Sequence, residues 1–445
     1  MQTATSEPVA RRRHALVAVL TILPFVLLVI AVARYGFDAP FQDSWAFVKV
    51  LERSYAGQFP WAELWAQHNE HRLFFPKLVM LALARATHWD LRVELAATIL
   101  FAVGTFAVVA RMWRRTAKRL DVNGAEWMLP LLSLLLFSMS QWQAWLWGWQ
   151  LQMTLNILVV VGAVALLTAA QPAWWKLLAA ACLGFVATHS FASGLAVWPI
   201  GLCLLLCDRS PKRRENAIRV TFWLAATAAS VYSYFHGYME PAEHTAYGAF
   251  LKHPFRYGGY VLAYLGAPIA PWNTWAAMAC GAIGVVVCVA LGTGLVRDKQ
   301  LGLPAIAPYF GLALYALANA MITGIGRSGY GLGQALSSRY IPFASLLWIP
   351  LAALLMIHAS KAAETGRRHM ARVSRALLCA MAGFVLLAIA YGTYRADERW
   401  DAFVPAREAL LKGDDAAQLG HLYPDVEFLR EQREILRRYR LSVFR

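Results

Sequence analysis

Long apolar stretches recur along the whole chain, with shorter polar segments between them. A helix needs about 20 apolar residues to cross the hydrocarbon core of a bilayer. Eleven stretches approach this length, and each predicts a membrane-spanning helix. The expected spans are 15–33, 93–110, 126–141, 151–169, 174–188, 193–207, 217–235, 274–296, 303–323, 341–358 and 374–393. The pattern predicts an all-α polytopic membrane protein with about eleven transmembrane helices, in a range of about 10–12.

The composition supports this class. Of the 445 residues, 59% are hydrophobic and 15% are charged, whereas soluble proteins carry about 25% charged residues. The net charge of +16 comes from short basic clusters between apolar stretches, which are typical of topology signals and exclude a nucleic-acid partner. The clusters predict an inside amino terminus and an outside C-terminal tail. All six cysteines lie within apolar stretches, which indicates neither a disulfide framework nor a metal site.

Three longer segments lie between the spans or after them. The first outer loop, 34–92, contains "DSWAFVKVLERSYAG" and "RLFFPKLVMLALARATHW", which predict interfacial helices, although the second could be a short span. The outer segment 236–273 is rich in glycine and proline and predicts an interfacial or re-entrant element. The tail contains one amphipathic stretch, "VEFLREQREILRRYR". We therefore expect a transmembrane domain, 1–393, followed by a polar outer tail, 394–445.

Polar residues suited to chemistry gather on the segments expected outside, whereas the inside loops hold only basic anchors. They are Asp38 and Asp43 after the first span, Glu70, His71 and Arg72 in "HNEHR", Trp147 and Gln150 in "SQWQAWLWGWQLQ", His189 in "THSFASG", and Arg327, Arg339 and Tyr340 in "GIGRSGYGLGQALSSRY". We therefore expect the functional site on the outer face.

The residue types favour group transfer from a lipid-linked substrate. A carboxylate can take the proton of an acceptor hydroxyl, and arginines can hold a phosphate leaving group. Tryptophan can stack on a sugar, and glutamine can bond its hydroxyls. The chain has no GxxxxGK[ST] phosphate loop, which argues against an ATP-driven pump. The GxGxxG-like "GIGRSGYGLG" follows an apolar span and not a strand, so it does not predict a dinucleotide site.

The order of three motifs resembles the GT-C superfamily of integral-membrane glycosyltransferases, which use polyprenyl-phosphate sugars. The motifs are "FDAPFQDSW", "HNEHRLFFPKL" and "RVELAATILFAVGTFAVVARMWRR", all within the first 120 residues. The chain resembles the bacterial O-antigen and cell-envelope glucosyltransferase-like members, and more distantly the protein mannosyltransferase and aminoarabinose transferase branch. In that branch paired prolines stand where this chain has Glu70, His71 and Arg72.

The resemblance implies a bacterial inner-membrane enzyme whose active site faces the periplasm. The donor would be a polyprenyl-phosphate sugar, and the acceptor a cell-envelope glycan or lipid such as lipopolysaccharide. Asp43 would be the catalytic base, because it stands where the superfamily has its first-loop acid. Asp38 is the alternative base.

Each acidic or histidine candidate also has a structural interpretation. Asp43 could N-cap the helix that begins "SWAFVKVL", and Asp38 could cap the loop. Glu70 and His71 could belong to the catalytic site, or could begin an interfacial helix. Asp43, Glu70 and His71 are also candidates to bind a divalent metal ion, the one cofactor considered.

The basic and aromatic candidates leave alternatives open in the same way. Arg327 and Arg339 are candidate phosphate ligands with Arg72 as a third, while Arg339 and Tyr340 could be interfacial anchors. Trp147 and Gln150 form a candidate sugar platform, or Trp147 belongs to an aromatic belt. His189 is either a substrate contact or a histidine satisfied between helices.

Two other functions remain as alternatives. A transporter or flippase for a lipid-linked glycan is expected to have internal repeats and charged residues deep in several spans. Few of either are present. An O-antigen ligase or polymerase would use arginine and histidine on a large late outer loop, whereas the late loop 324–340 is short.

Overall fold

Residues 6–169, 171–208, 212–240, 249–297 and 303–445 are described by the computed structural model. Within these residues the chain is helical apart from one short hairpin, β1 (Gln67–His68) and β2 (His71–Arg72). Seven helices there are long and apolar enough to cross a membrane. They are α1 (Ser6–Tyr35), α5 (Leu91–Leu120), α8 (Leu151–Leu167) with the turn before it, α14 (Thr274–Arg297), α15 (Leu303–Arg327), α16 (Ile341–Glu364) and α17 (Arg368–Lys412). The predicted all-α membrane class is confirmed.

The other four expected spans also fall on helices, which are shorter or more polar. These helices are α6 (Met128–Leu136), α9 (Trp174–Thr188), α10 (Val197–Cys207) and α11 (Arg213–Phe235). The prediction of a continuous helix over 126–141 was wrong. The helix α6 ends at Leu136 because Ser138 caps a 3-10 turn, Met139–Gln141, and the Gln141 side chain bonds the Leu135 carbonyl.

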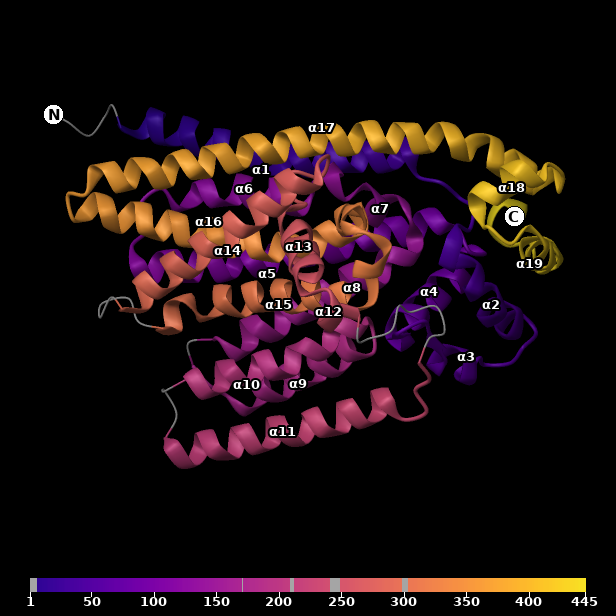
Figure 1. The fold of residues 1–445 in the computed structure, drawn as a ribbon, viewed down its shortest axis with the longest axis horizontal. Coiled ribbons are helices and arrows are strands. Elements are labelled where there is room, and N and C mark those ends of the chain that lie inside the picture. Colours follow the sequence, from indigo (N-terminus) through magenta and orange to yellow (C-terminus); the bar gives the residue numbers. More distant parts are fainter. Residues whose placement is uncertain (1–5, 170, 209–211, 241–248, 298–302) are drawn as a thin grey trace.

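The long helices lie side by side along the longest axis of the molecule (Figure 1). The helix α16 forms the centre, since 94% of its most apolar stretch is buried inside the protein, against 22% for α1 and 17% for α14. It contacts α6, α14, α15 and α17. The helices α1 and α14 therefore present most of their apolar surface to the surroundings, as membrane-facing helices do.

Short helices cover one end of this bundle. In the first outer loop they are α2 (Val48–Tyr55), α3 (Trp61–Trp65) and α4 (Phe74–Thr87), so helices form where both interfacial helices were expected. The remaining short helices are α7 (Trp142–Leu146), α12 (Ala249–Lys252), α13 (Pro254–Gly266), α18 (Ala416–Leu422) and α19 (Val426–Tyr439). The expected amphipathic tail helix corresponds to α19, which Asp425 caps.

The first outer loop and the C-terminal segment share one apolar core, which we call the outer core. It includes Trp45, Leu51 and Trp89 from the loop, and Phe403 and Leu436 from the C-terminal segment. Figure 1 places α18 and α19 beside α2 at the same end of the bundle. The helix α17 runs without a break past the expected boundary at 394 to Lys412, and it contributes Phe403 and Leu410 to the outer core.

A cluster of ion pairs also joins the C-terminal segment to the first outer loop. Arg445 Nη2 lies 2.5 Å from Asp38 Oδ2, and Arg445 Nη1 lies 2.8 Å from Asp90 Oδ2. Asp38 is 9% exposed and also accepts a hydrogen bond from the Leu91 backbone N–H, at the start of α5. One arginine thus connects the C-terminal segment to the first residues of the second long helix.

We expect Arg445→Ala to lower the stability of the protein by about 1–3 kcal/mol, because it leaves the buried Asp38 carboxylate without its cation. Thermal unfolding in detergent measures the loss, and hydrogen exchange should rise in α19 first. Arg430→Ala is the matched control, because Arg430 is an exposed arginine of the same segment. Equal stability of the two variants would contradict a stabilising role for this cluster.

Candidate functional site

A tight hairpin presents two histidines at the outer end of the bundle. His68 and His71 are paired across β1 and β2, and the turn between them consists of Asn69 and Glu70. Asn69 adopts φ 48°, a left-handed conformation that asparagine tolerates better than most residues. The alternative prediction of a helix beginning at Glu70 and His71 was therefore wrong.

Asp43 faces this hairpin from the 3-10 turn Gln42–Phe47. Its Oδ1 lies 3.7 Å from His68 Nε2, and its side chain is 39% exposed. Burial would raise the pKa of Asp43, but His68 and the positive charge of Arg339 outweigh it, so this pKa lies below its ordinary value. The side chain makes no N-capping hydrogen bond, so the capping interpretation was wrong. Asp43 is ionised at neutral pH, as a general base must be.

Glu70 and His71 connect the hairpin to α15. Glu70 Oε1 lies 3.5 Å from His71 Nε2 and 3.5 Å from Arg327 Nη2. His71 Nδ1 accepts a hydrogen bond from the Ala192 N–H, so the neutral imidazole carries its proton on Nε2, facing Glu70. Burial lowers the pKa of His71 to about 4, which keeps the ring neutral at neutral pH.

Arg339 approaches the same region from the segment before α16. Gln143 holds this segment, because its Oε1 accepts hydrogen bonds from the Ser337 and Ser338 hydroxyls and from the Arg339 backbone N–H. The Arg339 guanidinium lies 5.9 Å from the ring centre of Trp147 and 5.2 Å from that of Tyr340. Its Nε is buried and makes no hydrogen bond within the described residues.

Trp147 joins Arg339 to the first outer loop. Its Nε1 donates to the Phe41 carbonyl at 3.1 Å and to the Ser44 hydroxyl at 3.2 Å. Asp43 lies between these two acceptors in the sequence. The aromatic-belt interpretation therefore does not describe Trp147, which is 4% exposed and hydrogen-bonded inside the outer end of the bundle.

Four other candidates have structural roles. Arg72 is 4% exposed, and its guanidinium donates to the backbone carbonyls of Trp65, Tyr234 and His236. It ties the hairpin to the end of α11 and has no side open to a phosphate.

His189 is buried and interacts with the Phe185 carbonyl and the Ser233 hydroxyl, as the satisfied-histidine interpretation expects. Asp38 belongs to the Arg445 cluster, and burial raises its pKa although the Leu91 N–H and Arg445 act in the opposite direction. Tyr340 is 5% exposed and accepts a hydrogen bond from Gln334 Nε2. Gln150 is also buried, and its Oε1 has no hydrogen-bond partner within the described residues.

The metal candidates do not form a coordination site. Among the described residues, no group of three or more His, Cys, Asp and Glu side chains is placed to hold a metal ion. The proposed set of Asp43, Glu70 and His71 fails because His71 Nδ1 accepts from Ala192, while the Glu70 carboxylate faces Arg327. His71 Nδ1 and Glu70 Oε1 already interact with donors of the protein.

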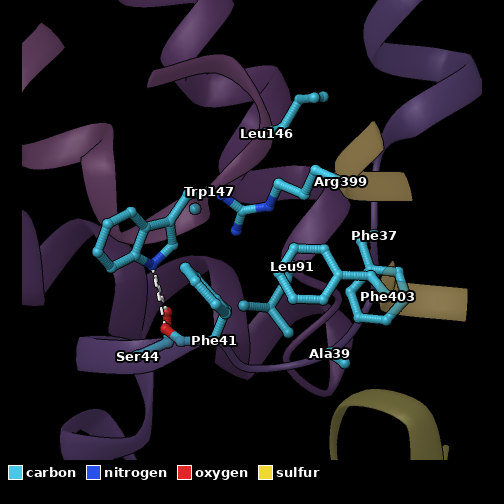
Figure 2. A pocket seen from close by; sticks show the side chains of 10 residues that line it. Phe37, Ala39, Phe41, Ser44, Leu91, Leu146, Trp147, Arg399 and Phe403 are labelled. Carbon is cyan, nitrogen blue, oxygen red and sulfur yellow. Dashed lines mark hydrogen bonds between the residues drawn. The ribbon is translucent and has the colours of Figure 1, made fainter. Parts of the chain in front are cut away.

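Sequence reasoning missed Arg399, which lies on α17 beyond the expected end of the last span. Arg399 lines a small pocket together with Ser44, Trp147, Phe41 and other apolar residues. Figure 2 shows the guanidinium pointing into this pocket beside Trp147. The available signal was an arginine placed four residues before Phe403 on a helical continuation of the span.

Comparisons of the chain with protein-family models, with curated proteins and with solved structures gave no match. The site is therefore interpreted from its own geometry and from the motif order described above.

We expect Arg72→Ala to destabilise the protein by about 1–3 kcal/mol for each buried carbonyl left without a donor. Arg53→Ala serves as the control in the same loop, because Arg53 is half exposed and forms a surface ion pair with Glu63. That variant should lose no more than about 1 kcal/mol. Thermal unfolding of the two purified variants distinguishes them, and equal midpoints would disprove the structural role of Arg72.

Proposed function

We propose that this protein is an integral-membrane glycosyltransferase of the GT-C type. It moves a sugar from a polyprenyl-phosphate donor to a cell-envelope glycan or lipid, such as lipopolysaccharide. The observation that carries the proposal is the convergence of first-loop and late-loop charges at one end of the bundle. Asp43 lies in the positive field of Arg339, and Glu70 lies 3.5 Å from Arg327.

The proposed reaction needs a base and an anion site close together. The acceptor hydroxyl attacks C1 of the sugar while Asp43 takes the hydroxyl proton. The bond between C1 and the phosphate oxygen breaks, and its electron pair leaves with polyprenyl phosphate. Arg339 stabilises the charge on that phosphate, as guanidinium groups do for phosphoryl oxygens. The configuration at C1 inverts, because no covalent sugar–enzyme intermediate forms.

We assign supporting roles to two neighbours, His68 and Trp147. His68, 3.7 Å from Asp43, orients the carboxylate. Trp147, which is 4% exposed, fixes the turn that carries Asp43 by donating to the Phe41 carbonyl and the Ser44 hydroxyl. Catalysis then rests on positioning and electrostatics, because a phosphate leaves without protonation.

We further propose eleven crossings of the bacterial inner membrane, with the site facing the periplasm. Because the first outer loop and the C-terminal segment share the outer core, both lie on one side of the membrane. An even number of crossings must therefore separate them, and the ten expected spans after the first satisfy this. The nine residues of α6 rise only about 13 Å, so α6 crosses together with the following turn and α7.

The topology is tested by reporters that are active on only one side of the membrane. A periplasm-specific reporter, such as alkaline phosphatase, should be active after Arg445 and silent when inserted after Gly366, between α16 and α17. The basic residues around Gly366 favour the inside. Activity of a cytoplasm-specific reporter after Arg445 would contradict the eleven crossings.

The catalytic role of Asp43 is tested by Asp43→Asn, which keeps the shape of the side chain and removes the base. Turnover of a polyprenyl-phosphate sugar by the purified protein in lipid should fall about 10²–10⁴-fold. Folding and donor binding should persist. The wild-type rate should hold from neutral to mildly acidic pH and fall only below about pH 4, because the pKa of Asp43 lies below its ordinary value.

Asp38→Asn is the control for this variant, since Asp38 is committed to Arg445. It should lower stability and leave the turnover of the folded fraction largely intact. Normal turnover in Asp43→Asn with collapse in Asp38→Asn would move the base to Asp38. Normal turnover in both would remove the mechanism.

A further inference from the structure

Arg399 is a cation with no carboxylate partner in the part of the chain that the structure describes. Within the described residues its guanidinium has no carboxylate within ion-pair distance, and no hydrogen bond joins it to another residue. Its neighbours on α17 differ, because Arg395 pairs with Glu398 at 2.9 Å. Asp397 and Asp401 are exposed, and Asp397 accepts from the Tyr35 hydroxyl at 3.0 Å. Residues two apart on a helix do not face each other, so neither aspartate reaches Arg399.

Aromatic rings take the place of the missing anion. The Arg399 guanidinium lies 4.1 Å from the ring centre of Phe41, 4.3 Å from that of Phe403 and 5.2 Å from that of Trp142. Each ring presents a negative face that stabilises a cation. The rings fix the plane of the guanidinium but accept none of its five N–H groups in the way an oxygen would. The side chain is held in place with its donors unused.

The pocket beside Arg399 is lined by donors and apolar groups. The Ser44 hydroxyl oxygen accepts from Trp147 Nε1, so its own O–H can donate into the pocket. The lining contains no carboxylate. Figure 2 shows Arg399 and Ser44 on either side of Phe41, with Trp147 next to both. A space with a fixed cation, a free hydroxyl and no acidic residue suits an anionic oxygen.

The size and position of the pocket limit what can bind. It has room for about one water molecule, so it admits a single phosphoryl oxygen and not a sugar ring. It lies where the first outer loop leaves α1 and meets α17, two helices that are mostly uncovered by the rest of the protein. Phosphates of membrane lipids lie at this level of a membrane protein, just beyond the apolar part of the spans.

We propose that Arg399 and Ser44 bind an anionic lipid through one phosphoryl oxygen that enters this pocket. That oxygen accepts from the guanidinium edge and the Ser44 hydroxyl, while the lipid chain runs along α1 and α17. Trp147 separates this pocket from Arg339, so a phosphate here lies next to the proposed site of sugar transfer. Assigning the lipid as the polyprenyl-phosphate substrate rests on the proposed function, whereas the binding of a lipid phosphate does not.

Binding of lipids without any sugar tests the proposal. Native mass spectrometry of the purified full chain in detergent would compare a polyprenyl phosphate, the matching polyprenol, phosphatidylglycerol and phosphatidylcholine. We expect Arg399→Gln to weaken binding of the polyprenyl phosphate about 10–100-fold, as loss of a charge-assisted contact does, and to leave polyprenol binding unchanged. Arg395→Gln, one turn earlier on the exposed face of α17, should bind like the wild type.

Two further variants keep the test decisive if Arg399→Gln folds poorly. Arg399→Lys keeps the charge and should bind with intermediate affinity, because ammonium replaces a bidentate guanidinium only in part. Ser44→Ala should weaken binding by less than Arg399→Gln. Unchanged phosphate binding in folded Arg399→Lys and Ser44→Ala, or in folded Arg399→Gln, would overturn the proposal.

The lipid panel identifies the source of the phosphate. Arg399-dependent binding of polyprenyl phosphate alone would assign the pocket to the substrate. Arg399-dependent binding of phosphatidylglycerol as well would assign it to the headgroup of a membrane lipid. Arg399-dependent binding in a protein that transfers no sugar would retain this inference and reject the proposed function. Sugar transfer at the wild-type rate in an Arg399→Gln protein with weakened lipid binding would retain the proposed function and assign the pocket to a membrane lipid.

Discussion

The packing of the first outer loop against the C-terminal segment is the interaction on which the candidate site depends. Trp45 and Phe47 are buried in the outer core and follow Asp43 within the same 3-10 turn. Because these two rings are fixed by residues such as Phe403 and Leu410, the 3-10 turn that carries Asp43 has a defined position. Without this core, a loop of almost 60 residues at a membrane surface would pay a large conformational entropy to hold one carboxylate in place.

Two adjacent carboxylate–histidine pairs, Asp43 with His68 and Glu70 with His71, have different roles. Asp43 stays ionised, since His68 and Arg339 favour its charge. His71 is neutral and faces Glu70, which also faces Arg327. The first pair is partly open to solvent, while the second connects the hairpin to α15. One pair is thus available for chemistry, and the other holds the hairpin against the bundle.

The helices could be predicted from the sequence, and much of the site could not. Apolar stretches of about 20 residues specify helices through local hydrogen bonding, which is why each of the eleven expected spans contains one. The hairpin of His68 and His71 depends on the left-handed Asn69, and the commitment of Arg72 depends on carbonyls more than 160 residues away. The role of Arg399 was hidden for a similar reason, because its rings come from the first loop and from Trp142 as well as from α17. Contacts of such long range leave no local periodic signal.

The outer core also sets the order in which the protein is completed during synthesis. Trp89 and Phe403 meet in that core, yet more than 300 residues separate them in the chain. At translation rates of about 5–20 residues per second, the first loop waits roughly 15–60 s for its partner. During that interval the part of the loop that the C-terminal segment covers in the finished protein stays uncovered. The membrane interface, which accepts aromatic side chains readily, is the surface on which the unfinished loop can rest until the last helix arrives.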